Sequence, residues 1–260
     1  MSEPRSQHLI SARELIDHPV PRPVVLHVGR ASATLPAPQV KIAGAHVTEL
    51  EDDFGGPADG ERGRLPLPDA RSVTDRIRSW GIDGATPVIV YAARSELVSA
   101  ATRAWFVLRW AGLPDVRLLD GGLDAWRAEG GGTEDIATTA PAVPSAFTAS
   151  PGRLPTIDAD RAAQFGARGN LLDARDKAAY AGGHIPGARL VPSPVFDDGR
   201  LKSAEALQSA LPIPAAVYCG AGVSATTVAF AYATLGRTVP VYVASWSGWT
   251  ADADRPIEQA

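Results

Sequence analysis

The only cysteine of this 260-residue chain lies in a glycine-rich segment, YCGAGVSA, at positions 218–225. Gly220 and Gly222 lack side chains and allow backbone angles that other residues avoid, so successive N–H groups can converge on one point. Such N–H groups, together with the dipole of a helix that follows them, favour a thiolate over a thiol. We therefore predict that Cys219 is a nucleophile held by an anion-binding loop. The alternative is an inert thiol, because free cysteine is often buried in protein cores.

Two elements must position this loop. An apolar run, AAVYC, precedes it, and the segment 223–236 that follows has apolar residues at helical spacing and ends in glycine. Other short runs, such as VIVY and VPVYV, are continuously apolar, which is typical of parallel strands covered by helices on both faces. The sequence thus predicts an α/β fold with Cys219 at the carboxyl end of a strand, where open sheets of this class bind ligands.

The motifs around the loop occur twice, in the same order. A helix with a capping box, formed by Ser11 and Glu14, precedes VVLHV, and in the second half Asp158 begins a helix that precedes NLLDA. IAGAHV parallels IPGARLV, PVIVYAA parallels AAVYCGA, and DGGLDAW parallels ASWSGW. In this alignment Ala92 occupies the position of Cys219, so the first half has no nucleophile. Self-similarity of this kind indicates a duplicated domain.

The segment between the two halves predicts the domain boundaries. Residues 138–155 are rich in Pro, Ser, Thr and Ala and carry no charge before Arg153, which is poor material for helices and strands. We expect this segment to link a noncatalytic domain, residues 1–137, to a catalytic domain, residues 156–260. Each domain is expected to be a small parallel sheet flanked by helices.

Composition narrows the classes of partner. Hydrophobic residues make up 45% and charged residues 21% of the chain, and the net charge of -4 comes without a dense Lys/Arg block, so we expect neither nucleic acid nor an anionic membrane as a partner. The chain has no apolar run of membrane-spanning length and begins without the pattern of a secretory signal, so we expect a cytoplasmic protein. The Cys and His residues do not cluster at ligand spacing, and we expect no metal and no organic cofactor.

Four ordered motifs carry a family resemblance: LLDAR at 171–175, GHIPGA at 183–188, YCGAGVSA at 218–225 and SWSGW at 245–249. In this order they resemble the tandem-domain rhodanese family of sulfurtransferases, and the resemblance covers nearly the whole chain. It implies two rhodanese-like domains. It also implies that Cys219 accepts a sulfur atom from thiosulfate or 3-mercaptopyruvate as a persulfide and passes it to cyanide or a thiol. Such a two-step transfer is covalent catalysis and predicts ping-pong kinetics.

The resemblance assigns further site residues. Backbone N–H groups of the loop would hold the persulfide, and they belong to Gly220, Ala221, Gly222, Val223 and Ser224. Arg175 ends LLDAR and would bind the carboxylate or sulfonate of a small anionic donor, for which its forked N–H groups are suited. The positions of His184 and Trp246 are more typical of packing, although Trp246 could also form a wall of the pocket.

Three features depart from the family pattern. The loop CGAGVSA is closer to the loops of the 3-mercaptopyruvate enzymes than to the basic loops of the thiosulfate enzymes, yet Ala221 replaces a loop serine. Lys41 replaces a histidine before the first-half IAGA motif, where it could supply positive charge across the domain interface. Ala179 and Ala181 stand where a second arginine is expected. Loss of that arginine predicts a high KM for either donor, because a hydrogen bond to a charged group is lost.

Two other functions stay open on the sequence. A noncatalytic sulfur carrier or interaction protein would keep the fold without efficient donor binding, and the departures at Ala221, Lys41 and Ala179 favour it. A phosphatase-like hydrolase is disfavoured, because the six-residue loop 219–224 has the length typical of sulfurtransferases and lacks the arginine of phosphatase loops.

Overall fold

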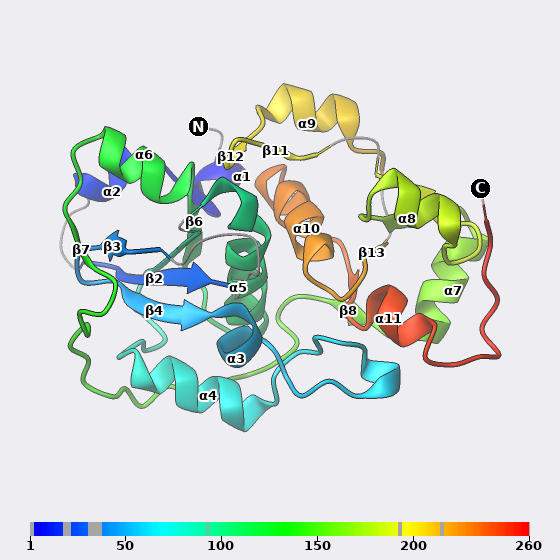
Figure 1. Ribbon diagram of the computed structural model, residues 1–260, viewed down its shortest axis with the longest axis horizontal. Helices are drawn as coiled ribbons and strands as arrows, with labels where there is room; N and C mark the ends of the chain where they lie inside the picture. The colour runs from blue at the N-terminus through cyan, green and yellow to red at the C-terminus, as the bar shows by residue number, and fades with distance from the viewer. Residues whose placement is uncertain are drawn as a thin grey trace.

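The computed structural model describes residues 3–17, 22–30, 38–92, 94–191, 194–213 and 216–259. Its two halves each contain a five-stranded sheet in which every pair of neighbouring strands is parallel (Figure 1). Helices flank both sheets, the first half lying on the left of Figure 1 and the second on the right. The predicted α/β fold class, with two parallel sheets flanked by helices, is confirmed.

The first sheet has the strand order β1-β6-β5-β2-β4. Its strands are β1 (Leu9–Ile10), β2 (Val24–Gly29), β4 (His46–Glu49), β5 (Val88–Ala92) and β6 (Val116–Leu119). The helices of this half are α1 (Glu3–Ser6), α2 (Ala12–Ile16), α3 (Leu50–Phe54), η1 (Gly60–Arg62), α4 (Ala70–Ser79), η2 (Ser95–Leu97), α5 (Val98–Trp110) and α6 (Gly122–Ala128). An antiparallel pair, β3 (Val40–Ile42) and β7 (Thr133–Asp135), completes it. Every residue of the central strand β5 is buried, which accounts for its continuous apolar run.

The second sheet has the strand order β10-β9-β13-β14-β8. Its strands are β8 (Thr156–Ile157), β9 (Leu171–Asp173), β10 (Arg189–Leu190), β13 (Ala216–Tyr218) and β14 (Val241–Tyr242). Its helices are α7 (Ala159–Ala167), α8 (Lys177–Gly182), α9 (Ala204–Ala210), α10 (Ser224–Thr234) and α11 (Ser245–Trp249). A short antiparallel hairpin, β11 (Phe196–Asp197) and β12 (Arg200–Leu201), lies between β10 and α9 in the chain. Here too the central strand, β13, is wholly buried.

The helix starts follow the local sequence signals. Ser11 and Glu14 form the predicted capping box at the start of α2, and Asp158 caps α7 by accepting the N–H of Arg161. The helix expected after the cysteine loop is α10, which begins at Ser224. Among the described residues, none of the helices combines the length and the apolar character that a membrane crossing requires.

The two halves meet through α5 and α10, which pack against each other at the centre of the molecule (Figure 1). The hydroxyls of Thr102 and Thr227 are 2.9 Å apart across this contact. Trp105 meets Phe230 edge to face, with ring centroids 5.0 Å apart. Because α10 starts at the end of the cysteine loop, the first half braces the element that positions the loop.

The segment 138–155 contains no helix or strand and runs along the first half. The N–H of Ser150 donates to the carbonyl of Ala111 at 2.8 Å, and the guanidinium of Arg78 donates to the carbonyl of Phe147 at 2.6 Å. The segment thus has a fixed path over α4 and α5. The exact domain boundaries at 137 and 155 stay a prediction.

Candidate functional site

Cys219 directly follows β13, so it lies at the carboxyl edge of the second sheet. It is 2% exposed, a burial that suits an inert core thiol as well as a shielded nucleophile. The polar contacts of its sulfur separate these two interpretations. The N–H of Gly222 donates to Sγ, with an N–Sγ distance of 3.1 Å, and the hydroxyl of Ser245 lies 3.8 Å from Sγ. Two polar groups therefore contact the sulfur, and such contacts stabilise an anion.

Gly222 can take its place only because it has no side chain. Its φ of +79° lies in the left-handed region that favours glycine, and a Cβ here would be 2.5 Å from the carbonyl oxygen of Val243. This conformation turns the Gly222 N–H back toward Cys219. The glycine in the motif is thus needed for the hydrogen bond to sulfur.

The other predicted loop residues occupy the approach to the thiol. Gly220 and Ala221 are partly exposed, Val223 is buried, and Ser224 is exposed at the first turn of α10. The loop is also tied to α11, since the carbonyl of Cys219 accepts the N–H of Trp246 at 2.9 Å. The loop therefore presents one open side to solvent and is fixed on the other.

A buried arginine from the first half lies directly beneath the loop. The guanidinium of Arg103, on α5, is fully buried and donates to Gly222, whose carbonyl oxygen is 3.1 Å away. It also donates to three other backbone carbonyls, those of Phe54, Leu65 and Pro66. Burial lowers the pKa of Arg103 to about 10, and the charge that Cys219 can carry opposes this shift. Arg103 is therefore a cation at neutral pH.

Arg103 has no carboxylate partner among the residues that the structure describes. A buried charge without a counter-ion is costly, so an anion at Cys219 would be stabilised by this cation. Our sequence analysis did not identify Arg103. The available signal was a basic residue inside the apolar helix AATRAWFVL, because arginine is rarely buried without a specific partner.

Arg175 is predicted to bind the donor, but most of its guanidinium N–H groups donate to acceptors within the protein. Its Nη2 lies 2.6 Å from Oδ2 of the fully buried Asp173 and 2.7 Å from the carbonyl oxygen of Gly183. Its guanidinium also stacks on the ring of Trp246, 4.4 Å from the ring centroid. The side chain is only 9% exposed. Arg175 therefore holds the β9 end and α11 together, and its role in donor binding stays a prediction.

Lys41 lies away from the cysteine loop, contrary to the role we considered for it. It is fully buried on β3, where its ammonium pairs with Glu134 of β7 and donates to the carbonyl of Ala45 at 2.7 Å. All of these partners belong to the first half. The expectation that Lys41 supplies charge across the domain interface is wrong, because a buried ammonium must be satisfied by partners close to its own strand.

A cavity of about 680 Å³ opens between the two halves beside the loop. Its lining includes Ser95 and Val98 from the first half, and Arg175, Ser224 and Thr227 from the second. It is large enough for a small anionic donor. Ala179 and Ala181 lie on α8 and are partly buried, and the cation of this helix that lines the cavity is Lys177, at its first position.

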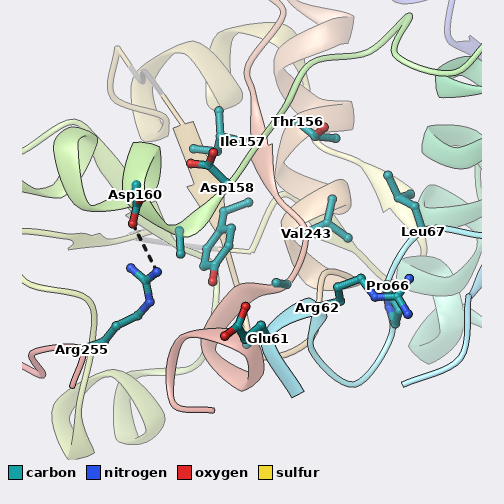
Figure 2. Close-up of a pocket in the computed structure, with 14 residues that line it drawn as sticks. Glu61, Arg62, Pro66, Leu67, Thr156, Ile157, Asp158, Asp160, Val243 and Arg255 are labelled. Carbon is teal, nitrogen blue, oxygen red and sulfur yellow. Dashed lines mark hydrogen bonds and ion pairs between the residues drawn. The ribbon is translucent and has the colours of Figure 1, made fainter. Parts of the chain in front are cut away.

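A second cavity, of about 440 Å³, lies at the carboxyl ends of β8 and β14 (Figure 2). Figure 2 shows Glu61 and Arg62 of the first half facing Asp158 and Val243 of the second, with Arg255 paired to Asp160. The cysteine loop does not contribute to its lining. The cavity of 680 Å³ is therefore the better candidate for the donor.

Comparison with known proteins agrees with this geometry. The family model for the rhodanese-like domain matches residues 41–129 and 158–252, one match in each half. The putative thiosulfate sulfurtransferase SseB of Mycobacterium tuberculosis is 36% identical over 241 residues, covering 84% of this chain and 83% of that protein. The probable 3-mercaptopyruvate sulfurtransferase of Pseudomonas aeruginosa is 37% identical over 243 residues, covering 83% of each.

Among solved structures, the chain resembles SseA of Escherichia coli, a 3-mercaptopyruvate sulfurtransferase, with a TM-score of 0.76 over 92% of this chain and 98% of that one. The sequence identity is 24%, so this similarity speaks for the fold. The matched relatives are named as sulfurtransferases, and the expectation of an enzyme of this class is confirmed. The chain belongs to the rhodanese family, with one rhodanese-like domain in each half.

Proposed function

We propose that the protein transfers sulfane sulfur from thiosulfate or 3-mercaptopyruvate to cyanide or a thiol, through a persulfide on Cys219. The surroundings of the thiol carry this proposal. Gly222 aims an N–H at Sγ over 3.1 Å, and its carbonyl is held by the buried cation of Arg103. An inert core cysteine would need neither group, whereas a thiolate or a persulfide anion is stabilised by both.

With thiosulfate, the thiolate of Cys219 attacks the outer sulfur. A sulfur–sulfur bond forms to Cys219, the bond between the outer sulfur and the sulfonate breaks, and sulfite leaves with the electron pair. With 3-mercaptopyruvate the carbon–sulfur bond breaks, and the carbon takes the electron pair and then the thiol proton to give pyruvate. In the second step cyanide or a thiolate attacks the outer sulfur of the persulfide and releases the Cys219 thiolate.

The described residues favour neither donor decisively. Both donors present an anionic head group, and both fit the cavity that Ser224 and Thr227 line. The lost arginine positions, Ala179 and Ala181, weaken the expected binding of either head group. We therefore expect a high KM unless another cation of this chain replaces the missing arginine.

The test is a steady-state assay with each donor and cyanide, together with mass spectrometry of the protein after incubation with donor alone. The wild type should turn over and gain the mass of one sulfur atom, and Cys219→Ala should do neither while keeping its far-UV circular dichroism. As a matched control, the double variant Cys219→Ala/Ala92→Cys places the thiol at the equivalent strand end of the first half. It should also gain no sulfur.

The same assay tests the carrier alternative. The departures at Ala221 and Ala179 favour a protein that holds sulfur without turning over, and such a protein would show one sulfur adduct per chain without catalysis. Persistence of turnover in Cys219→Ala would contradict the persulfide route itself.

A further inference from the structure

On its own half, the donor cavity is lined by two cations, the paired Arg175 and the exposed Lys177 at the start of α8. Arg175 is paired with Asp173 and Gly183, and Ala179 and Ala181 occupy the positions of the family's second arginine. Lys177 supplies a point charge and not the planar fork that matches two oxygens of thiosulfate or of a carboxylate donor. The question is whether the first half supplies a guanidinium.

The segment between η1 and α4 brings the first half up to the cysteine loop. Gly63, with a φ of +83°, packs so closely on α11 that a Cβ would be 2.4 Å from the carbonyl oxygen of Ala244. The next residue, Arg64, donates its backbone N–H to the hydroxyl of Ser247 at 3.1 Å. Ser247 in turn donates its own backbone N–H to the carbonyl of Gly220 at 3.0 Å. A chain of short contacts therefore fixes the backbone of Arg64 relative to the loop.

The side chain of Arg64 extends over the residue that follows the nucleophile. Its Nη2 lies 3.7 Å from the position that a Cβ would take at Gly220, and apart from Gly220 and its two chain neighbours no other described residue has an atom within 4 Å of that position. The residue is exposed, and among the described residues no carboxylate pairs with it. The absence of a side chain at Gly220 thus leaves open space between the guanidinium and the loop.

Arg62, two residues earlier, shows the contrast. It is also exposed, but its Nε lies 2.6 Å from Oδ2 of Asp59, and it faces the cavity of Figure 2 instead of the loop. One arginine of this segment is therefore neutralised within its own turn. The other stands unpaired beside Gly220.

We propose that Arg64 binds the anionic head group of the sulfur donor, so that the noncatalytic half completes the active site. This inference rests on the proposed sulfur transfer. The planar fork of a guanidinium matches two oxygens of a sulfonate or a carboxylate. Arg64 and Gly220 do not line the cavity of 680 Å³, so the head group would lie at the open side of the loop, over Gly220, with the sulfur of the donor near Cys219. Arg64 takes over the role that the arginine missing at Ala179 and Ala181 would have had.

Kinetics with both donors test this assignment. Arg64→Gln should lower kcat/KM for thiosulfate by about 10- to 100-fold, mainly through KM, because a charge-assisted contact to the bound donor is lost. Arg64→Glu should lower it further, since it adds repulsion. Arg62→Gln is the matched control and should leave kcat/KM within about twofold of the wild type. Equal kinetics for Arg64→Gln, Arg64→Glu and the wild type would overturn the assignment.

Alkylation of the single cysteine gives a readout that does not depend on turnover. Iodoacetate is an anion and iodoacetamide is its neutral analogue, so the ratio of their rates reports a cation near Cys219. Arg64→Gln should reduce the iodoacetate rate at least fivefold and leave the iodoacetamide rate unchanged. An unchanged ratio would overturn the role of Arg64 while leaving sulfur transfer intact. Absence of wild-type turnover with either donor, with the ratio shifted as expected, would instead count against the proposed function.

Discussion

Tyr91 and Tyr218 occupy equivalent places in the two halves, near the carboxyl end of the central strand. Each hydroxyl accepts the backbone N–H of an isoleucine that opens the IAGA or IPGA turn: Ile42 at 2.9 Å in the first half and Ile185 at 3.1 Å in the second. Both tyrosines are fully buried. The duplicated fold has therefore kept one buried hydrogen bond that ties the turn to the central strand.

The partner across the neighbouring strand differs between the halves. His27 pairs in register with Tyr91, and their Nδ1 and Oη atoms are 3.1 Å apart. Asp173 pairs in register with Tyr218 and accepts its hydroxyl at 2.5 Å. The carboxylate can also hold Arg175, which a neutral imidazole cannot do. The second half thus gained a fixed guanidinium at the strand edge, next to the cysteine loop.

The residues before the two turns show the same divergence. Lys41 precedes Ile42 as His184 precedes Ile185, and each is buried. His184 bonds to the carbonyl of Tyr180 through Nδ1 at 3.1 Å, whereas Lys41 pairs with Glu134. Both residues therefore anchor a turn. Each residue is held by partners of its own half, which keeps Lys41 at its own turn and away from the cysteine loop.

The two halves thus share a fold and differ in where their charged side chains lie. The first half has Ala92 where the second has Cys219, and it contributes cations to its neighbour instead. Arg103 lies beneath the loop and Arg64 beside it. In the function that we propose, the first half is therefore part of the site as well as its support.

Replacing Arg103 gives the largest expected effect. Arg103→Met would remove the donors that four buried carbonyls share, and breaking a buried network of this kind costs about 3–5 kcal/mol. We expect the free energy of unfolding to fall by that amount, as measured by urea denaturation. The variant should also lose sulfur transfer under conditions where it is still folded, because Gly222 and the sulfur lose their cation.

Arg109→Met is the matched control, since Arg109 lies on the same helix and also donates to a backbone carbonyl, that of Pro114. This carbonyl can be solvated, so we expect a loss of about 1 kcal/mol or less. If the two variants lost the same free energy of unfolding, the contact of Arg103 with the loop would add no more stability than an exposed hydrogen bond.

The sequence predicts the fold and the position of Cys219 well, because the patterns that indicate them involve residues close together in the chain. The capping box at Ser11, the apolar strands and the glycine loop each reflect neighbours in the chain, and they placed Cys219 correctly at the end of β13. Arg64 and Arg103 lie more than 100 positions before Cys219, and no local pattern indicates that they reach it. Charges contributed across a domain interface depend on the packing of α5 and η1, which periodicity does not encode.

The second-largest expected change is the loss of stability when the pH falls, which we assign to His27. Burial and then the charge of Lys41 lower the pKa of His27 to about 4, whereas a histidine in the unfolded chain titrates near 6.5. As the pH falls from about 6.5 to 4, the unfolded chain gains a proton that the folded chain lacks, so the free energy of unfolding falls by up to about 3 kcal/mol. Urea denaturation at pH 7 and pH 4.5 measures this loss.

His27→Gln isolates this contribution, because His8 has a similarly lowered pKa and titrates in parallel. The variant keeps a polar group toward Tyr91 but cannot take up a proton. We expect its stability to fall less between the two pH values than that of the wild type. If the variant and the wild type lost the same free energy of unfolding between the two pH values, His27 would not contribute to the pH dependence. The histidine would then not distinguish the first half from the second in this respect.

The smallest expected change in stability comes from the turn after β14, which corresponds to the turn after β6 in the first half. Gly122 has a φ of +54° and Ser245 a φ of +55°, so a serine adopts a conformation that usually requires glycine. The strain places the Ser245 hydroxyl 3.1 Å from the N–H of Cys219. Strain of this kind is typical of functional sites.

Substituting Ser245 separates the strain from the hydrogen bond. Ser245→Gly would relieve about 1 kcal/mol of strain and lose about 1 kcal/mol of hydrogen bonding, so its stability should match the wild type. Ser245→Ala loses the bond and keeps the strain, so it should be about 1 kcal/mol less stable than Ser245→Gly in urea denaturation. Both variants should lose sulfur transfer to the same degree, because both leave the N–H of Cys219 without its acceptor. Greater stability of the alanine variant would mean that this turn, unlike that of Gly122, is relaxed with a side chain in place.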